Sequence, residues 1–561
     1  MSALLILVVS CALFVIAYIF YGAWLAKQWG VDVNRKTPAH TMTDGVDYVP
    51  ARAPVLLGHH FASIAGAGPI NGPILAAVFG WVPVLLWVVV GGIFFGAVHD
   101  FASLFASIRH GGRSIGQVIL ANIGKQGKKL FLIFAWLTLM LVVAAFADIV
   151  ASTFNGFTAE GQPNPANGST AMASVLFLVL SVLFGFSVYR RNAPLGVASA
   201  IGVALLVCCI AIGIAFPIYL TKTAWLGLIF IYIYVASITP VWILLQPRDY
   251  LNSFLLYGTI IAAVIGILFT NPTMNLPAFT GFNVGGSWLF PMLFITVACG
   301  AISGFHSLVG SGTTAKQLNN EKDARIIGYG GMLIECVLAV ISLIAVGALF
   351  ANGAMPQGTP PIIFANGIAQ FTAVLGVPSN IAFTVVTLAI SAFALTSLDT
   401  ATRLARYIFQ EYFTGDEGAA KEVTGARKLL TNTHFATLIC VVCGGLLAVG
   451  GYQNIWPLFG SANQLLAGLA LLAAAVWLGN IGKNNKMFYI PMLFMLVATL
   501  TALALTFNKN LGLLAAGTGV IYKEGLQCLF AALLFILAVV LSIQGFKVLF
   551  GKKKAQAEEA A

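Results

Sequence analysis

The chain has 561 residues, of which 59% are hydrophobic and only 8% are charged. About a quarter of the residues of a soluble globular protein are charged, so this composition excludes a water-soluble globular fold for most of the chain. The net charge of +11 does not indicate nucleic-acid binding, because the basic residues lie in short clusters between apolar runs, which is the pattern that orients a membrane protein.

Apolar runs close to twenty residues long recur along the whole chain, and about 20 apolar residues are needed to cross a hydrocarbon core of about 30 Å. They predict fifteen transmembrane helices, near residues 2–22, 54–79, 82–106, 129–152, 171–187, 194–217, 224–245, 253–270, 287–311, 326–350, 380–398, 433–450, 453–478, 487–506 and 526–549. The first run has no cleavage signature of small residues, so we expect it to stay in place rather than to act as a removable signal peptide. The segment 361–376 is shorter and more polar, which favours an external surface helix or a re-entrant helix.

The distribution of basic residues predicts the orientation. With the N-terminus outside and the C-terminus in the cytoplasm, nearly all Lys and Arg residues fall on the cytoplasmic side, with Lys222, Lys509 and Lys523 as exceptions. An even number of spans would scramble this bias. The sequence therefore predicts an inner-membrane protein with an odd number of spans.

A short internal repeat is the most informative feature. Residues 61–68 read Phe-Ala-Ser-Ile-Ala-Gly-Ala-Gly, and residues 305–312 read Phe-His-Ser-Leu-Val-Gly-Ser-Gly. The two copies lie in predicted spans that run in opposite directions. Two glycine-interrupted helices of opposite direction are typical of a transporter with an inverted repeat and discontinuous helices, although small residues also promote close helix packing.

The repeat also predicts a substrate site. Interrupted helices free backbone N–H and C=O groups, which are tolerated at membrane depth only where protein or a hydrated cavity satisfies them, and which can then bind an anion or a cation. The candidate substrate-binding residues lie at the two interruptions and beside them, and are His59, His60, Ser63, Gly66, Gly68, Asn71, His306, Ser307, Gly310 and Gly312.

Ionisable groups inside the apolar runs are the remaining candidates. Asp100, Asp148, Glu335 and Asp399 lie within or at the edge of predicted spans, where a charge costs several kcal/mol and is usually functional. With the nearby histidines they could relay protons, hold a metal, or only satisfy one another by hydrogen bonds. Asp148 and Glu335 fit a structural role as well as a coupling role. The eight cysteines lack metal-ligand spacing and are interpreted as apolar fillers.

Five segments resemble the carbon starvation protein A family. The longest is Gly-His-His-Phe-Ala-Ser-Ile-Ala-Gly-Ala-Gly-Pro-Ile-Asn-Gly-Pro-Ile-Leu-Ala at 58–76, and the others lie at 96–101, 111–116, 304–314 and 456–464. The resemblance covers nearly all of 1–550. It implies a LeuT-like fold of the amino acid–polyamine–cation superfamily, and import of pyruvate or small peptides during carbon limitation.

A further match concerns ion coupling. Phe-Ala-Leu-Thr-Ser-Leu-Asp-Thr at 393–400 resembles the segment of sodium-coupled LeuT-like transporters that helps to coordinate a cation. The resemblance implies an ion site with Thr396 and Ser397, and Asp399 nearby would allow a proton instead. A Ser/Thr pair bonding back to its own helix is the structural alternative. Asp100 completes the candidate ion-coupling residues.

Together these features predict an all-α polytopic membrane protein of about fifteen transmembrane helices, with a LeuT-like inverted repeat and two discontinuous helices. A single transmembrane domain is expected over 1–550, with an inverted-repeat core near 54–480, peripheral helices at 487–549 and a basic, flexible cytoplasmic tail at 551–561. The predicted activity is cation-coupled import of pyruvate or small peptides, driven by H⁺ or Na⁺. We expect no catalytic residues, no metal site, no cofactor and no nucleic-acid partner.

Three other functions are considered. An intramembrane enzyme would leave the repeat unexplained, and the chain has no HExxH and no Gly-rich phosphate loop. A membrane metabolite sensor would need an output domain larger than the loop 399–432. A channel is compatible with interrupted helices. The sequence alone does not determine the substrate, the coupling ion or the oligomeric state.

Overall fold

The computed structural model describes residues 2–45, 47–158, 160–191, 193–240, 243–414 and 425–559, and the described chain is almost entirely helical. The first helices are α1 (Ala3–Ile16), α2 (Ala23–Trp29), α3 (Pro38–Thr41), α4 (Ala53–Ile64), α5 (Gly68–Ala76), α6 (Trp81–Leu86), α7 (Ala97–Arg109), α8 (Ile115–Asn122) and α9 (Lys125–Phe154). The next are α10 (Pro165–Tyr189), α11 (Leu195–Ala215), α12 (Lys222–Ile238), α13 (Leu245–Thr270), α14 (Leu289–Thr296), α15 (Gly304–Val309), α16 (Ala315–Gln317), α17 (Gly331–Leu349) and α18 (Pro360–Ala373). The last are α19 (Ser379–Thr414), α20 (Ala426–Leu430), α21 (Thr433–Ala448), α22 (Tyr452–Asn480), α23 (Tyr489–Ala515) and α24 (Leu526–Glu559).

Short segments of other geometry connect several of these helices. π-helical stretches occupy Ala17–Gly22, Trp87–Gly96, Gly310–Thr314, Arg325–Gly330 and Ile521–Gly525, and single 3₁₀ turns occupy Ala77–Phe79 and Lys486–Phe488. The strands β1 (Asn283–Val284) and β2 (Ser287–Trp288) pair antiparallel as one small hairpin. α24 continues to Glu559, so a helix extends over residues 551–559 that the sequence suggested as a tail.

Eleven helices in the described residues are long and apolar enough to cross a membrane, or up to 12 if one bent pair counts as a span. The predicted count of fifteen is therefore not confirmed. The helices at Lys222–Ile238 and Thr433–Ala448 are apolar but shorter than a full span. The predicted span 287–311 is divided into α14 and α15 by a stretch without helical structure.

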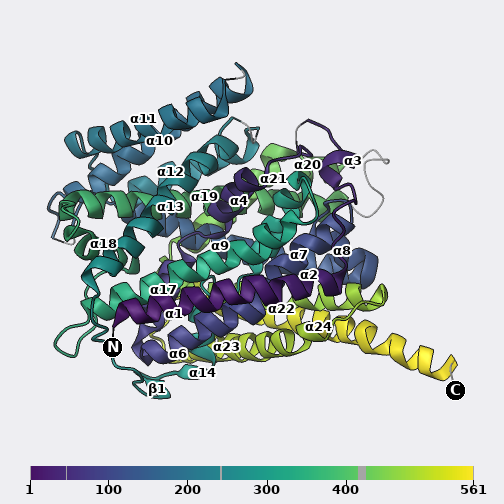
Figure 1. Ribbon diagram of the computed structural model, residues 1–561. Coiled ribbons are helices and arrows are strands. Elements are labelled where there is room, and N and C mark those ends of the chain that lie inside the picture. The colour runs from purple at the N-terminus through teal and green to yellow at the C-terminus, as the bar shows by residue number, and fades with distance from the viewer. Residues whose placement is uncertain are drawn as a thin grey trace.

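The helices form one bundle with a buried centre and lipid-compatible edges. α9, α19 and α22 form the most buried part, and 94% of the most apolar window of α22 is buried. Figure 1 shows α10 and α11 side by side at one edge of the bundle, with α23 and α24 at another. The outer helices expose large apolar side chains such as Phe186, Ile201 and Ile490. Apolar exposure of this extent is stable when hydrocarbon replaces water.

Two helices are longer than the sequence suggests. α13 begins at Leu245 and α19 continues to Thr414, whereas the predicted spans begin at 253 and end at 398. The added turns contain Arg248, Asp249 and Arg403, which we placed outside the spans because isolated charges are costly in a membrane. All three are buried. The residues 415–424 of the following loop lie outside the described part of the chain.

The first copy of the internal repeat contains a helix interruption, and the second copy lies next to one. α4 and the helical segment Gly68–Phe79 are bent by 46° across a break of three residues. The second interruption, residues 297–303, comes just before the second copy rather than inside it. The two interruptions touch, because a Cβ on Gly68 would lie only 2.5 Å from Cys299 Sγ. Glycine permits this approach because it has no side chain.

A second close approach positions the start of α15. A Cβ on Gly304 would overlap the carbonyl oxygen of Asn463 and would lie 2.5 Å from the backbone nitrogen of Ala467, both on α22. We therefore expect Gly304→Ala to destabilise the protein by at least about 1–3 kcal/mol, the usual cost of overpacking. Gly310→Ala is the matched control, because its nearest neighbour, Leu104, would lie at 3.8 Å. Thermal unfolding in detergent checks the difference, and equal midpoints for the two variants would show that α15 is not fixed by this contact.

Candidate functional site

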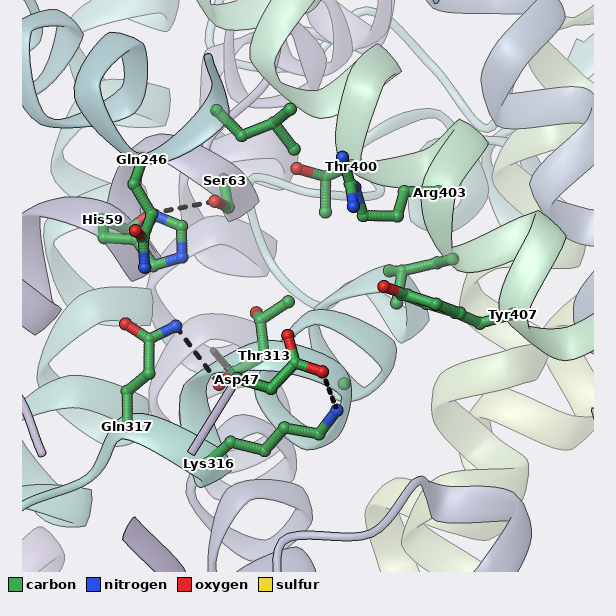
Figure 2. Close-up of a pocket in the computed structure, with 13 residues that line it drawn as sticks. Asp47, His59, Ser63, Gln246, Thr313, Lys316, Gln317, Thr400, Arg403 and Tyr407 are labelled. Carbon is green, nitrogen blue, oxygen red and sulfur yellow. Dashed lines mark hydrogen bonds and ion pairs between the residues drawn. The ribbon is translucent and has the colours of Figure 1, made fainter. Parts of the chain in front are cut away.

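A polar cavity lies between α4, α19 and the segment that follows α15 (Figure 2). It has a volume of about 40 Å³, which is room for a few water molecules. Three of the candidate substrate residues line it, namely His59 and Ser63 on α4 and Gly312 in the π-helical stretch. Both copies of the repeat therefore contribute to a single polar cavity.

Arg403 places a positive charge at this cavity. Its side chain comes from α19, is buried, and donates hydrogen bonds to the backbone carbonyls of Ala236 and Thr239 through one terminal nitrogen. Its Nε is buried and has no hydrogen-bond partner among the described residues. A guanidinium is the side chain best suited to bind a carboxylate. Thr400, one turn earlier, and Tyr407, one turn later, line the same cavity (Figure 2).

A second cavity continues from the first toward the surface. The two share Asp47, Gly312, Lys316, Leu404 and Tyr407 in their linings, and the second has a volume of about 440 Å³. Lys316 Nζ lies 3.7 Å from the half-exposed carboxylate of Asp47, which Figure 2 marks as an ion pair.

Two further polar residues line the second, outer cavity. Arg113 supplies a further positive charge to its lining. Burial raises the pKa of Tyr48 above its usual range, so its hydroxyl stays protonated, and it donates a hydrogen bond to the carbonyl of Gly111. These groups form a polar vestibule that widens outward from the inner cavity.

Hydroxyl groups of α19 lie against the end of α4. Ser397 Oγ donates to the backbone carbonyl of Ser63 at 3.3 Å, and a Cβ on Gly66 would lie 2.7 Å from the same Oγ. Thr396 Oγ1 accepts a hydrogen bond from Asn252 Nδ2 on α13 at 3.2 Å. The structural alternative of a Ser/Thr pair bonding to its own helix is not what these contacts show. Carbonyl and hydroxyl oxygens of this kind are ligands for hard cations.

Asp399 belongs to a different arrangement. It forms a buried ion pair with Arg248 of α13, and Tyr232 of α12 donates its hydroxyl to the same carboxylate at 2.6 Å. Arg248 also donates to Asp249 at 2.9 Å, and the other carboxylate oxygen of Asp249 lies 3.5 Å from His59 Nδ1. The Asp399 charge is therefore paired with a cation of the protein.

A second buried polar cluster lies at the start of α15. His306 Nδ1 is 2.7 Å from Asp100 Oδ2, and His99 Nδ1 is 2.7 Å from the other oxygen of that carboxylate. His306 Nε2 lies 3.4 Å from Glu335 Oε2 on α17. Cys299 completes the cluster, because its Sγ lies within 4.8 Å of donor atoms of His306 and Glu335. These last three residues are the described residues whose side chains could jointly hold a metal ion.

The remaining predicted site residues are buried away from the cavity. His60 Nδ1 is 2.8 Å from Thr314 Oγ1, and Ser307 Oγ donates to the carbonyl of Gly304. Both polar atoms of the Asn71 side chain are buried without a hydrogen-bond partner in the described chain. Gly310 faces Leu104.

Sequence reasoning missed several polar residues at the site. Arg403, Lys316 and Thr400 line the cavity, and Arg248 neutralises Asp399. The spacing of Asp399 and Arg403 could have indicated that both side chains belong to the site, because residues four apart lie on one face of a helix. The predicted span ends at 398 and therefore excludes both residues.

Comparison with known proteins identifies the family. The family model described as "Carbon starvation protein CstA" matches residues 2–358 and 348–502. The chain belongs to this family. The peptide transporter CstA of Escherichia coli (strain K12) is 35% identical over 89% of this chain and 80% of its own length. The peptide transporter CstA of Bacillus subtilis (strain 168) is 32% identical over 100% of this chain and 98% of its own length. The pyruvate/proton symporter BtsT of Escherichia coli (strain K12) is 34% identical over 91% of this chain and 82% of its own length.

Solved structures give a more distant likeness. The manganese transporter of Eremococcus coleocola, in complex with an aromatic bis-isothiourea substituted compound, aligns with a TM-score of 0.48 at 11% identity over 90% of this chain and 99% of the other. MhsT in complex with L-phenylalanine aligns with a TM-score of 0.45 at 15% identity over 88% of this chain and 99% of the other. Family membership and the apolar helices together identify the chain as a polytopic membrane protein whose relatives are named transporters.

Proposed function

We propose that the protein is a cation-coupled secondary transporter of the bacterial inner membrane that imports pyruvate or small peptides. The observation that supports this most is the polar cavity shared by both repeat copies, with the buried guanidinium of Arg403 in its lining. Pyruvate and a short peptide both carry a carboxylate, which a guanidinium binds well. The relatives named as peptide transporters and as a pyruvate/proton symporter support the same two substrate classes.

The vestibule joins the cavity to the cytoplasmic side, because Lys316 and Arg113 line it and belong to the basic segments that the predicted orientation places there. The imported substrate therefore leaves the cavity through the vestibule. The inner cavity of about 40 Å³ is too small for pyruvate, so α4 or α19 moves when the substrate enters. Alternating access then exposes the same site to the other side of the membrane. The N-terminus lies outside in this orientation.

The coupling cation binds between α4 and α19. Its ligands are the hydroxyls of Thr396 and Ser397 and the carbonyl of Ser63, all of which are oxygen atoms of neutral groups. Asp399 is not a ligand in this proposal, because Arg248 already neutralises it. Asp100 is also outside this site, because its two oxygens contact His99 and His306.

Accumulation in liposomes tests the proposal. Purified protein is reconstituted, a proton gradient or a sodium gradient is imposed separately, and labelled pyruvate and labelled dialanine are followed. One gradient should drive uptake against the substrate gradient. Ser397→Ala should lose the accumulation, whereas Ser391→Ala should keep it, because Ser391 Oγ on the same helix donates to the carbonyl of Leu388 within its own helix. Downhill leakage without accumulation would indicate a channel, and no movement of either substrate would contradict transport of both classes.

A further inference from the structure

Three different metal-ligating side chains meet at one fully buried place beside the second interruption. Cys299 lies in the non-helical stretch, His306 on α15 and Glu335 on α17, and one donor atom from each lies within 4.8 Å of the others. His306 Nε2 and Glu335 Oε2 are 3.4 Å apart. Two ligands at about 2.0–2.2 Å from a shared tetrahedral ion stand at about this separation.

Two of the three side chains have donor atoms without a hydrogen-bond partner among the described residues, whereas Cys299 Sγ lies 3.6 Å from Ser303 Oγ and 3.7 Å from Asn463 Nδ2. His306 Nε2 and both oxygens of Glu335 are buried and make no hydrogen bond within the described residues, although the Glu335 side chain is 0% exposed. An unsatisfied buried polar group costs about 1–3 kcal/mol, and an unpaired carboxylate costs more. Nε2 of His306 and the two oxygens of Glu335 lie close together without a hydrogen bond, an arrangement that a bound cation would satisfy.

The histidine is held in the orientation that metal ligation requires. Asp100 Oδ2 accepts from Nδ1 of His306 at 2.7 Å, and His99 fixes the second oxygen of Asp100 at 2.7 Å. With its proton on Nδ1, His306 turns the lone pair of Nε2 toward Glu335 and Cys299. A carboxylate behind a ligating histidine is the usual outer shell of a protein metal site.

A proton on Glu335 satisfies the cluster less well than a metal ion does. The 3.4 Å between Nε2 and Oε2 is longer than an O–H···N hydrogen bond, and a single proton leaves the other oxygen of Glu335 without a partner. A divalent ion contacts all three residues and offsets the negative charges of Glu335 and of the Cys299 thiolate.

We propose that Cys299, His306 and Glu335 bind a divalent first-row transition metal ion, with Zn²⁺ the best match to a thiol, imidazole and carboxylate set. This site goes beyond the proposed transport function and differs from our expectation of no metal. Three protein ligands leave one coordination position open. Cys299 packs against Gly68 at the break between α4 and α5, so the ion lies where the two interruptions meet.

Metal content tests the proposal directly. Full-length protein without a polyhistidine tag is stripped with a chelator, incubated with ZnCl₂, freed of excess metal by gel filtration, and measured by inductively coupled plasma mass spectrometry. We expect about one Zn²⁺ per chain for the wild type and near-complete loss in Glu335→Gln. Cys336→Ser is the matched control, because Cys336 is the next residue on α17, is equally buried, and lies against Gly92.

Cobalt substitution gives a second readout, which does not depend on whether the Glu335→Gln variant folds. Wild-type protein loaded with Co²⁺ should show a thiolate-to-cobalt charge-transfer band, which Cys299→Ser should lose and Cys336→Ser should keep. Absence of retained metal in the wild type would overturn the proposal, as would equal retention by Glu335→Gln and Cys299→Ser. A protein without metal in which Glu335→Gln still abolishes gradient-driven uptake would assign Glu335 to transport instead, and would also overturn the proposal.

Discussion

Arg403→Ala is expected to reduce uptake of pyruvate and of dipeptides by about 10- to 100-fold, because a charge-assisted hydrogen bond contributes about 1.5–3 kcal/mol. The loss should appear mainly as a raised KM, since in the proposed cycle the guanidinium binds the carboxylate in every state that contains substrate. Arg403→Lys should recover only part of the affinity, because an ammonium group cannot form the two parallel hydrogen bonds of a guanidinium. Initial uptake rates over a range of substrate concentrations measure both parameters.

The structure offers a matched control on the same helix. Arg406 is also buried, but its guanidinium stacks on Tyr407 and is not part of the cavity lining. Arg406→Ala should therefore leave the KM within about threefold of the wild type. Equal effects of Arg403→Ala and Arg406→Ala on KM would mean that Arg403 acts through the packing of α19 rather than on the substrate.

Asp399→Asn is expected to destabilise the protein by about 3–5 kcal/mol, the usual cost of leaving one member of a buried ion pair without its partner. Arg248 is buried and would keep only Asp249 as a counter-charge. The double variant Arg248→Met/Asp399→Leu should recover most of the lost stability, because replacing both charges by apolar groups removes the cost of burying them. Denaturant titration in detergent measures the free energies of unfolding of the wild type, of Asp399→Asn and of the double variant.

An exposed ion pair gives the comparison for this experiment. Asp47 pairs with Lys316 at 3.7 Å, and its side chain is 40% exposed. Exposed pairs contribute about 0–1 kcal/mol, so Asp47→Asn should change stability by less than about 1 kcal/mol. If Asp399→Asn loses as little stability as Asp47→Asn, the result would contradict the role that we assign to the buried pair. If the double variant does not regain the lost stability, the fold requires the two charges themselves.

The sequence located most of the helical segments because these depend on local properties. Apolar runs define where helices can cross a membrane. The glycines near 66 lie at the break between α4 and α5, whereas the second interruption, at 297–303, comes several residues before Gly310. Span number was harder to predict, because α12, α14 and α21 are apolar but short, and length alone does not show how a short helix sits in the bundle.

The polar contacts could not be predicted in the same way. Arg248 meets Asp399 although the two are 151 residues apart, and Cys299 meets Gly68 across the bundle. Such pairs are set by how helices pack, and a single sequence contains no record of which charges face each other. The rule that ends a span at a charge hid Arg248 and Arg403, since a buried charge is compatible with a helix once a partner neutralises it.

Substrate protection of an engineered cysteine tests most directly whether the polar cavity is the transport route. Thr400 lines the cavity and is buried, and no cysteine lines either of the two cavities described. A negatively charged methanethiosulfonate should modify Thr400→Cys in the conformation that admits the substrate, and saturating pyruvate or dialanine should slow that reaction about tenfold or more, as expected when a bound ligand excludes the reagent. Thr414→Cys, at the exposed end of α19, should react at the same rate with or without substrate. If Thr400→Cys transports normally yet reacts at an unchanged rate in the presence of saturating substrate, the substrate takes another route and the cavity is not its binding site.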